Sequence, residues 1–216
     1  MPVRNTLPKR LLWVEGKDDS ALVQSLCKNQ QVPEVFLIED RQGFRNVLKG
    51  LGVELRRRGL ERFGIVVDAN GDVDARWASI RNILLSEGYP EAPDSPAPDG
   101  TILSAPGRAR VGAWLMPDNA SPGMLEDFAA RLIPADDYLW ARAAEVVDGI
   151  PDEHRRFAAG HRSKAVVHTW LAWQETPGSP MGQAIGQGSL PATAPDALRF
   201  VAWLRRLMID DMPDPP

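Results

Sequence analysis

Three short apolar runs, each followed by a polar turn and a segment with helical spacing, constrain the fold of this chain more than any other feature. The runs lie at residues 11–14, 34–38 and 63–67. In the segments that follow them, apolar residues recur every three or four positions, as they do on the buried face of an α-helix. Strands that alternate with helices in this way form a parallel sheet with helices on its faces. With a fourth strand predicted at residues 111–116, the sequence predicts an α/β fold.

The second half of the chain has a different pattern. The sequence predicts an α/β core over residues 1–117 and a helical C-terminal extension, packed on the core, over residues 118–216. Five prolines exclude a helix from residues 90–110, which form either a loop or a short hairpin through residues 101–104. The glycine- and proline-rich segment 176–195 is predicted to be a surface loop. Further helices are predicted near residues 122–132, 135–147, 163–174 and 194–209.

Composition narrows the classes of function. With 216 residues, 44% of them apolar, the chain can bury a hydrophobic core. The formal charge of −4 argues against binding nucleic acid through a large basic face. Cys27 is the only cysteine, which excludes a disulfide framework and a cysteine zinc site. No apolar run approaches the roughly 18 residues that span a membrane. Because the N-terminal segment also lacks a signal-peptide core, we expect a cytoplasmic protein with no membrane partner.

Acidic residues stand at the ends of the predicted strands. Glu15 follows the first strand and Asp68 the third, with Asn70 and Asp72 close behind Asp68. Ligands of parallel α/β sheets bind beyond the carboxyl ends of the strands, so these side chains are expected to converge on one edge. Clustered carboxylates repel one another unless a cation relieves them, and hard oxygen ligands suit Mg²⁺ or Mn²⁺. The pattern predicts a divalent metal site.

A purely structural interpretation of the same residues remains open. Asp and Asn are ordinary residues of turns and helix N-caps, and Asp72 fits that role as well as a metal-binding one. Glu15 is different, because glutamate is a poor N-cap and here ends an apolar strand just before Gly16. Glu126 and Asp127 follow the fourth strand and either complete the metal site or lie in the first turn of a helix starting at residues 121–122.

Basic residues offer only a local surface for phosphate. Arg56, Arg57 and Arg58 close the second predicted helix, where cations favour the helix dipole but also form the best local patch for a nucleic-acid backbone. Lys164 lies on a later helix and is either a phosphate contact or a solvated cation. The histidines at 154, 161 and 168 are seven residues apart, a spacing that does not match a helical zinc site.

Two stretches resemble the signatures of the Toprim domain: the strand ending in Glu-Gly in "LLWVEGKDD" and the strand ending in Asp-x-Asn in "IVVDANGD". The likeness covers about residues 10–117 and implies a compact parallel α/β fold. Toprim domains occur in topoisomerases, bacterial-type primases, recombination-mediator proteins and nucleases of the overcoming-lysogenisation-defect type. By this resemblance Glu15 is the general acid/base or metal-linked glutamate and Asp68 the first metal-binding aspartate. Asn70 stands where the family has a second aspartate, and Asp72 is its candidate replacement.

The resemblance and the residues together support two hypotheses from different classes. The first is a Mg²⁺-dependent Toprim-like nuclease, or a related phosphodiester-processing protein, whose partner is nucleic acid. The second is a binding or regulatory module that keeps the fold but has lost the chemistry, which Asn70 favours because it supplies no charge. The chain looks most like a small bacterial family of Toprim-like proteins without an assigned function. A receiver-like domain is a third possibility for the fold, but it would need a lysine at the end of a fifth strand.

Overall fold

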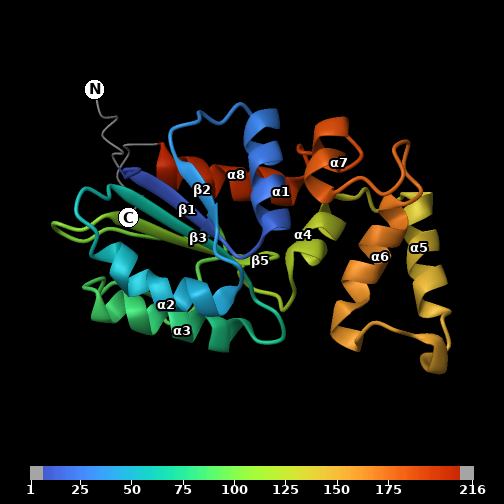
Figure 1. Cartoon of the computed structure of the whole chain (residues 1–216), viewed down its shortest axis with the longest axis horizontal. Helices are drawn as coiled ribbons and strands as arrows, with labels where there is room; N and C mark the ends of the chain where they lie inside the picture. Colours follow the sequence, from blue (N-terminus) through green and yellow to red (C-terminus); the bar gives the residue numbers. More distant parts are fainter. Residues whose placement is uncertain (1–6, 210–216) are drawn as a thin grey trace.

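The structure is a computed structural model that describes residues 7–209, and it is built around a five-stranded sheet flanked by helices (Figure 1). The strand order is β2-β1-β3-β5-β4. The strands are β1 (Arg10–Val14), β2 (Leu37–Asp40), β3 (Arg62–Asp68), β4 (Thr101–Leu103) and β5 (Arg110–Met116). All neighbouring pairs are parallel except β4 with β5, which is antiparallel. The predicted α/β fold is therefore confirmed.

Eight α-helices and two short 3₁₀ helices belong to the described residues. They are α1 (Lys17–Asn29), α2 (Phe44–Leu55), α3 (Val73–Ser86), α4 (Leu125–Leu132), α5 (Tyr138–Asp148), α6 (Arg162–Leu171), α7 (Met181–Gln187) and α8 (Pro195–Met208), with η1 (Asp152–His154) and η2 (Ala159–His161) between α5 and α6. The α5–α6 pair stands beyond α4, on the side away from the sheet (Figure 1). Within residues 7–209, none of these helices has the length and apolar character that a membrane crossing requires.

Alternating side chains give the sheet two buried faces. Trp13, Phe63 and Ile65 belong to the apolar cluster that α2 and α3 cover, and the rings of Trp13 and Phe63 meet edge to face. Leu12 and Trp114 point the other way, into the cluster that includes α1, α4 and α8. Because both faces are covered, the strands are nearly continuous apolar runs, as parallel strands usually are.

Three sequence predictions are corrected in detail. The second strand, predicted at residues 34–38, starts at Leu37 and ends at Asp40. The helix after β5 begins at Leu125, later than the predicted start at residues 121–122, with Met124 as its N-cap. The segment predicted to be a loop contains α7, whose apolar residues are too few for a periodic pattern. Of the two predictions for residues 90–110, the hairpin is confirmed, since β4 pairs with β5.

Helix α7 packs closely against α1 through a glycine. A β-carbon added at Gly182 would lie 2.7 Å from the backbone oxygen of Ala21, closer than packed atoms can approach. The same addition at Gly186, one turn later on α7, would meet nothing within 4 Å. Substitution of each glycine by alanine therefore tests whether the contact between α7 and α1 stabilises the fold.

We predict that Gly182→Ala lowers the free energy of unfolding by about 1–3 kcal/mol, because the helices must separate to admit the methyl group. Gly186→Ala, the control on the same helix, should be neutral or slightly stabilising, since alanine favours a helix over glycine. Urea unfolding followed by circular dichroism measures both. Equal stability of the two variants would show that α7 does not pack on α1 as described.

Candidate metal and phosphate site

Four carboxylates from separate elements meet at the carboxyl edge of the sheet. Glu15 follows β1, Asp19 lies in the first turn of α1, Asp68 ends β3, and Glu126 lies in the first turn of α4. All four line one open cleft with a volume of about 610 Å³. The other residues that line this cleft are Gly16, Lys17, Asp18, Asp40, Gln42, Gly43, Asn70, Met124, Leu125, His161 and Lys164. The convergence predicted for Glu15 and Asp68 is observed.

Backbone amides hold two of these carboxylates in place. An oxygen of Glu15 accepts a hydrogen bond from the backbone N–H of Asp68 at 3.1 Å. An oxygen of Asp68 accepts one from the backbone N–H of Leu125, the first residue of α4, at 2.9 Å. The two bonds link β1 to β3 and β3 to α4, so the carboxylates fix the relative positions of the elements that carry them.

Asp19 is the member of the cluster that the sequence did not single out. Its side chain is only 6% exposed, and its Oδ1 atom has no hydrogen-bond partner among the described residues. Gly16 leaves room for it, because a β-carbon at residue 16 would lie 3.2 Å from the Asp19 Oδ2 atom. The signal was the helical spacing: Asp19 precedes the buried Leu22 and Val23 by three and four residues, on the inner face of α1.

Burial and mutual repulsion keep protons on the cluster. Burial, then the charges of Asp68 and Glu15, raise the pKa of Asp19 to about 8. Burial, then the charges of Glu15 and Glu126, raise the pKa of Asp68 to about 7, against the opposing hydrogen bond from Leu125. Both carboxyls therefore bind protons near neutral pH, where an ordinary aspartate is ionised. A cation that displaced those protons would relieve the repulsion.

Lys164 provides a positive charge next to the carboxylate cluster. Its ammonium group on α6 lies 2.9 Å from an oxygen of Glu126, whose side chain is only 5% exposed. Hydrogen bonding to Glu126 raises the pKa of Lys164, with smaller contributions from Asp18 and Asp68. One buried charge of the cluster is thus neutralised from a helix of the C-terminal part, which connects that part to the site.

The chemistry of the donors fits a hard divalent cation. The cluster offers carboxylate oxygens, one of them without a partner, and the repulsion among them favours a doubly charged ion. The side chains do not form a preassembled site, because within residues 7–209 no group of three or more His, Cys, Asp or Glu residues already has the arrangement of a metal site. Ion binding would therefore require these side chains to close around the ion.

Three further residues of the predicted metal set differ in their positions. Asn70 lines the cleft in a left-handed conformation, with φ of 54°, and exchanges two backbone hydrogen bonds with Gly123. Asp72 is the N-cap of α3 and accepts a hydrogen bond from the backbone N–H of Ala75 at 2.9 Å. Asp127 accepts hydrogen bonds from the backbone N–H of Met124 and the hydroxyl of Ser163. Asp72 and Asp127 do not line the cleft.

The predicted arginine patch lies far from the carboxylates. Arg56, Arg57 and Arg58 follow α2, close to the start of β3, whereas the cleft lies at the end of that strand. Arg56 pairs with Glu87 at 2.8 Å, and Arg57 pairs with Glu54. Only Arg58 of the three is exposed without a described ion-pair partner. Of the residues predicted to bind nucleic acid, Lys164 alone lines the cleft.

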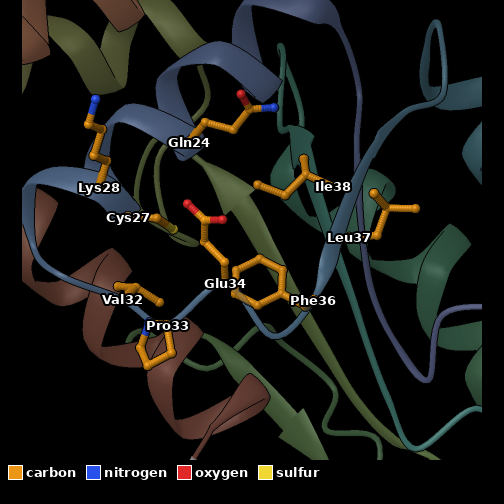
Figure 2. A pocket seen from close by; sticks show the side chains of 9 residues that line it. All are labelled: Gln24, Cys27, Lys28, Val32, Pro33, Glu34, Phe36, Leu37 and Ile38. Carbon is orange, nitrogen blue, oxygen red and sulfur yellow. The ribbon is translucent and has the colours of Figure 1, made fainter.

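A second hollow, with a volume of about 380 Å³, lies between α1 and the edge strand β2 (Figure 2). Cys27, Phe36 and Ile38 contribute to its lining, and none of the four cleft carboxylates does. Burial raises the pKa of the Cys27 thiol to about 12, so the thiolate needed for nucleophilic attack does not form near neutral pH. This hollow therefore shares no carboxylate with the cluster and provides no reactive thiolate.

The raised pKa values predict how stability depends on pH in the absence of divalent ions. The folded chain holds protons on Asp19 and Asp68 up to about pH 8 and 7, whereas in the unfolded chain both carboxyls release them near pH 3.8. The contribution of these two carboxyls to the free energy of unfolding is full below about pH 4. It is lost as the pH rises through their pKa values in the folded chain, because between the unfolded and folded pKa values the folded state binds more protons than the unfolded state. Asp19→Asn should remove part of this loss and raise stability at about pH 9 by on the order of 2 kcal/mol.

Urea unfolding in EDTA, from about pH 5 to about pH 9, measures the effect. Asp18→Asn is the matched control, since Asp18 is the exposed neighbour of Asp19, and it should leave the pH profile unchanged. If the wild type and Asp19→Asn lost stability equally with rising pH, Asp19 would not be a buried, protonated member of the cluster.

Comparison with known proteins gives a family for the chain. The family described as "Protein of unknown function (DUF3226)" matches residues 9–209, which include the whole sheet and all the carboxylates of the cleft. No curated protein matches the chain, and no solved structure matches it either. The chain therefore belongs to the DUF3226 family of proteins of unknown function.

Proposed function

We propose that this protein is a Mg²⁺- or Mn²⁺-dependent phosphodiester-processing enzyme, a nuclease that resembles the Toprim group. One observation carries the proposal: Glu15, Asp19, Asp68 and Glu126 come from four separate elements and line the same cleft. Buried like charges destabilise a fold, and carboxyls whose pKa values are shifted by burial and by charged neighbours cluster at functional sites. Glu15 and Asp68 are also the two residues that carry the Toprim resemblance.

The residues divide into a metal-binding and a phosphate-binding part. Asp19, Asp68 and Glu126 would hold the ion, and Glu15 would act as general base or as a further ligand. When bound, such an ion polarises a phosphate oxygen and lowers the pKa of a coordinated water. The chain itself contributes Lys164, which would leave Glu126 to the metal and offer its ammonium to the negative charge of the phosphate.

The entrance of the cleft also suits phosphate. Lys17, His161 and Lys164 line it together with the carboxylates. The N-termini of α1 and α2 open onto it at Gly16 and Gly43, neither of which caps its helix with a side chain. Uncapped N-termini present backbone N–H groups and a partial positive charge to an anion. These groups favour a phosphorylated substrate over a neutral one.

A binding or regulatory module is the second candidate, and Asn70 is the observation that favours it. Asn70 takes the left-handed conformation, which asparagine tolerates better than most residues, and its backbone is tied to Gly123. The position therefore serves the turn that brings α4 to β3 as well as any metal. A module of this kind would bind the ion and the phosphate but would not cleave.

Calorimetric titration with Mn²⁺ tests the metal site. We predict that Asp68→Asn and Asp19→Asn each weaken binding by more than about tenfold, because each removes an anionic oxygen ligand. Asp74→Asn is the control, since Asp74 is an exposed acid in the first turn of α3 that does not line the cleft. Absence of Mn²⁺ binding by the wild type at millimolar concentration would contradict the metal site.

Cleavage of labelled single- and double-stranded DNA and RNA with Mn²⁺ or Mg²⁺ separates the two candidates. The enzyme should cleave at least one substrate, EDTA should abolish the cleavage, and Glu15→Gln should reduce it by about 10²-fold or more, as expected for loss of a general base. Asp74→Asn should cleave like the wild type. Metal binding without any cleavage would favour the binding module.

A further inference from the structure

A further hollow joins the cleft on the side of α2 and α3. It has a volume of about 360 Å³ and shares Asn70 with the carboxylate cleft. Its other lining residues are Phe44, Ala69, Gly71, Asp72, Ala75, Arg76 and Ser79. We call it the Phe44–Arg76 groove. Its volume lies at the small end of ligand pockets, which suits one nucleotide unit and not a duplex.

Two side chains give this groove the chemistry of a nucleotide subsite. The Arg76 guanidinium lies over the Phe44 ring, 4.0 Å from its centroid. Among the described residues Arg76 has no carboxylate within ion-pairing distance, and its guanidinium donates no hydrogen bond. The ring contact holds the guanidinium over Phe44 while leaving its N–H groups available, an arrangement suited to a phosphate. The acid in the groove, Asp72, is engaged as the N-cap of α3.

The groove is also coupled to the carboxylates by charge. Arg76 acts electrostatically on Asp68, lowering its pKa against the larger effects of burial and the acidic neighbours. A chain of phosphates that passed from the cleft into the groove would therefore meet the Arg76 cation after the carboxylates. The exposed Ala75 provides a small apolar contact for a sugar or base.

We propose that the Phe44–Arg76 groove binds the nucleotide next to the one whose phosphate occupies the cleft, so that the substrate is a single strand of nucleic acid. The Arg76 guanidinium binds the neighbouring phosphate, and Phe44 holds the guanidinium in position. An aromatic ring combined with arginine is a recurrent means of binding single strands without sequence preference. This inference rests on the proposed function, since it says where the strand runs on leaving the carboxylates.

Binding of a fluorescein-labelled oligothymidylate, followed by anisotropy in Ca²⁺ to support binding without cleavage, tests the proposal. Arg76→Ala should weaken binding by about tenfold and lower the slope of log affinity against log salt by about 1, because one phosphate contact is lost. Arg76→Lys should fall between Arg76→Ala and the wild type, since it keeps the charge without the planar stacking. Phe44→Leu should weaken binding less than Arg76→Ala.

Arg108→Ala is the matched control, because it removes an exposed arginine just before β5, at the opposite edge of the sheet, and should change neither affinity nor salt slope beyond about twofold. Equal affinity and slope for Arg76→Ala and the wild type would overturn the proposal, as would an equal loss in Arg108→Ala. Failure of the wild type to bind the oligonucleotide would overturn it too. If thymidine monophosphate bound as tightly as the oligonucleotide, with the same sensitivity to Arg76→Ala, the groove would be a nucleotide site and the proposed strand path would be wrong.

Calorimetry with Mn²⁺ on Arg76→Ala separates this inference from the metal site. Arg76 is not a carboxylate ligand, so the variant should bind Mn²⁺ at least as tightly as the wild type. If the wild type bound the oligonucleotide through Arg76 but bound no Mn²⁺, the proposed enzyme would fail while the strand-binding groove would stand.

Discussion

The repulsion among buried carboxylates is the constraint on which the candidate site depends. Asp19 and Asp68 lie largely buried beside Glu15 and Glu126, and burial together with the neighbouring charges raises the pKa of both carboxyls. Hydrophobic packing alone would not favour this arrangement, because apolar residues of similar volume would avoid the penalty. The repulsion among the carboxylates is reduced by bound protons and by Lys164. In our account a divalent ion reduces it further.

The fold supplies the means of bringing these charges together. Parallel strands β1 and β3 are adjacent, so Glu15 and Asp68 end at the same edge although 53 residues separate them in sequence. Helix α4 adds Glu126, and its first amide binds Asp68. Helix α6, from the C-terminal part, then reaches Glu126 with Lys164. The helical half of the chain is therefore part of the site and more than a cover for the sheet.

Local pattern was sufficient for much of this arrangement but not for all of it. Strands β1, β3 and β5 agree with the predicted runs to within one residue at every end, because a strand buried on both faces is a continuous apolar run. Glu15 and Asp68 could be placed at one edge for the same reason.

Asp19 was overlooked because an acid in a first helical turn is ordinarily a surface residue, and only its register with Leu22 and Val23 reveals its burial. Helix α7 was missed because its position depends on packing against α1, and its own sequence has no helical periodicity. The pairing of Lys164 with Glu126 joins residues far apart in sequence, which no spacing rule predicts.

A crystal structure of the Mn²⁺-soaked protein, with anomalous scattering recorded at the manganese edge, would test the central claim most directly. The account predicts an anomalous peak between Asp68 and Asp19, with the Asp19 oxygen that lacks a protein partner among its ligands and the side chains of the cluster closed around it. A cleft that held no manganese at millimolar concentration, with Lys164 still paired to Glu126, would contradict the account. The carboxylates would then be a buried cluster held by protons and a lysine, without a metal function.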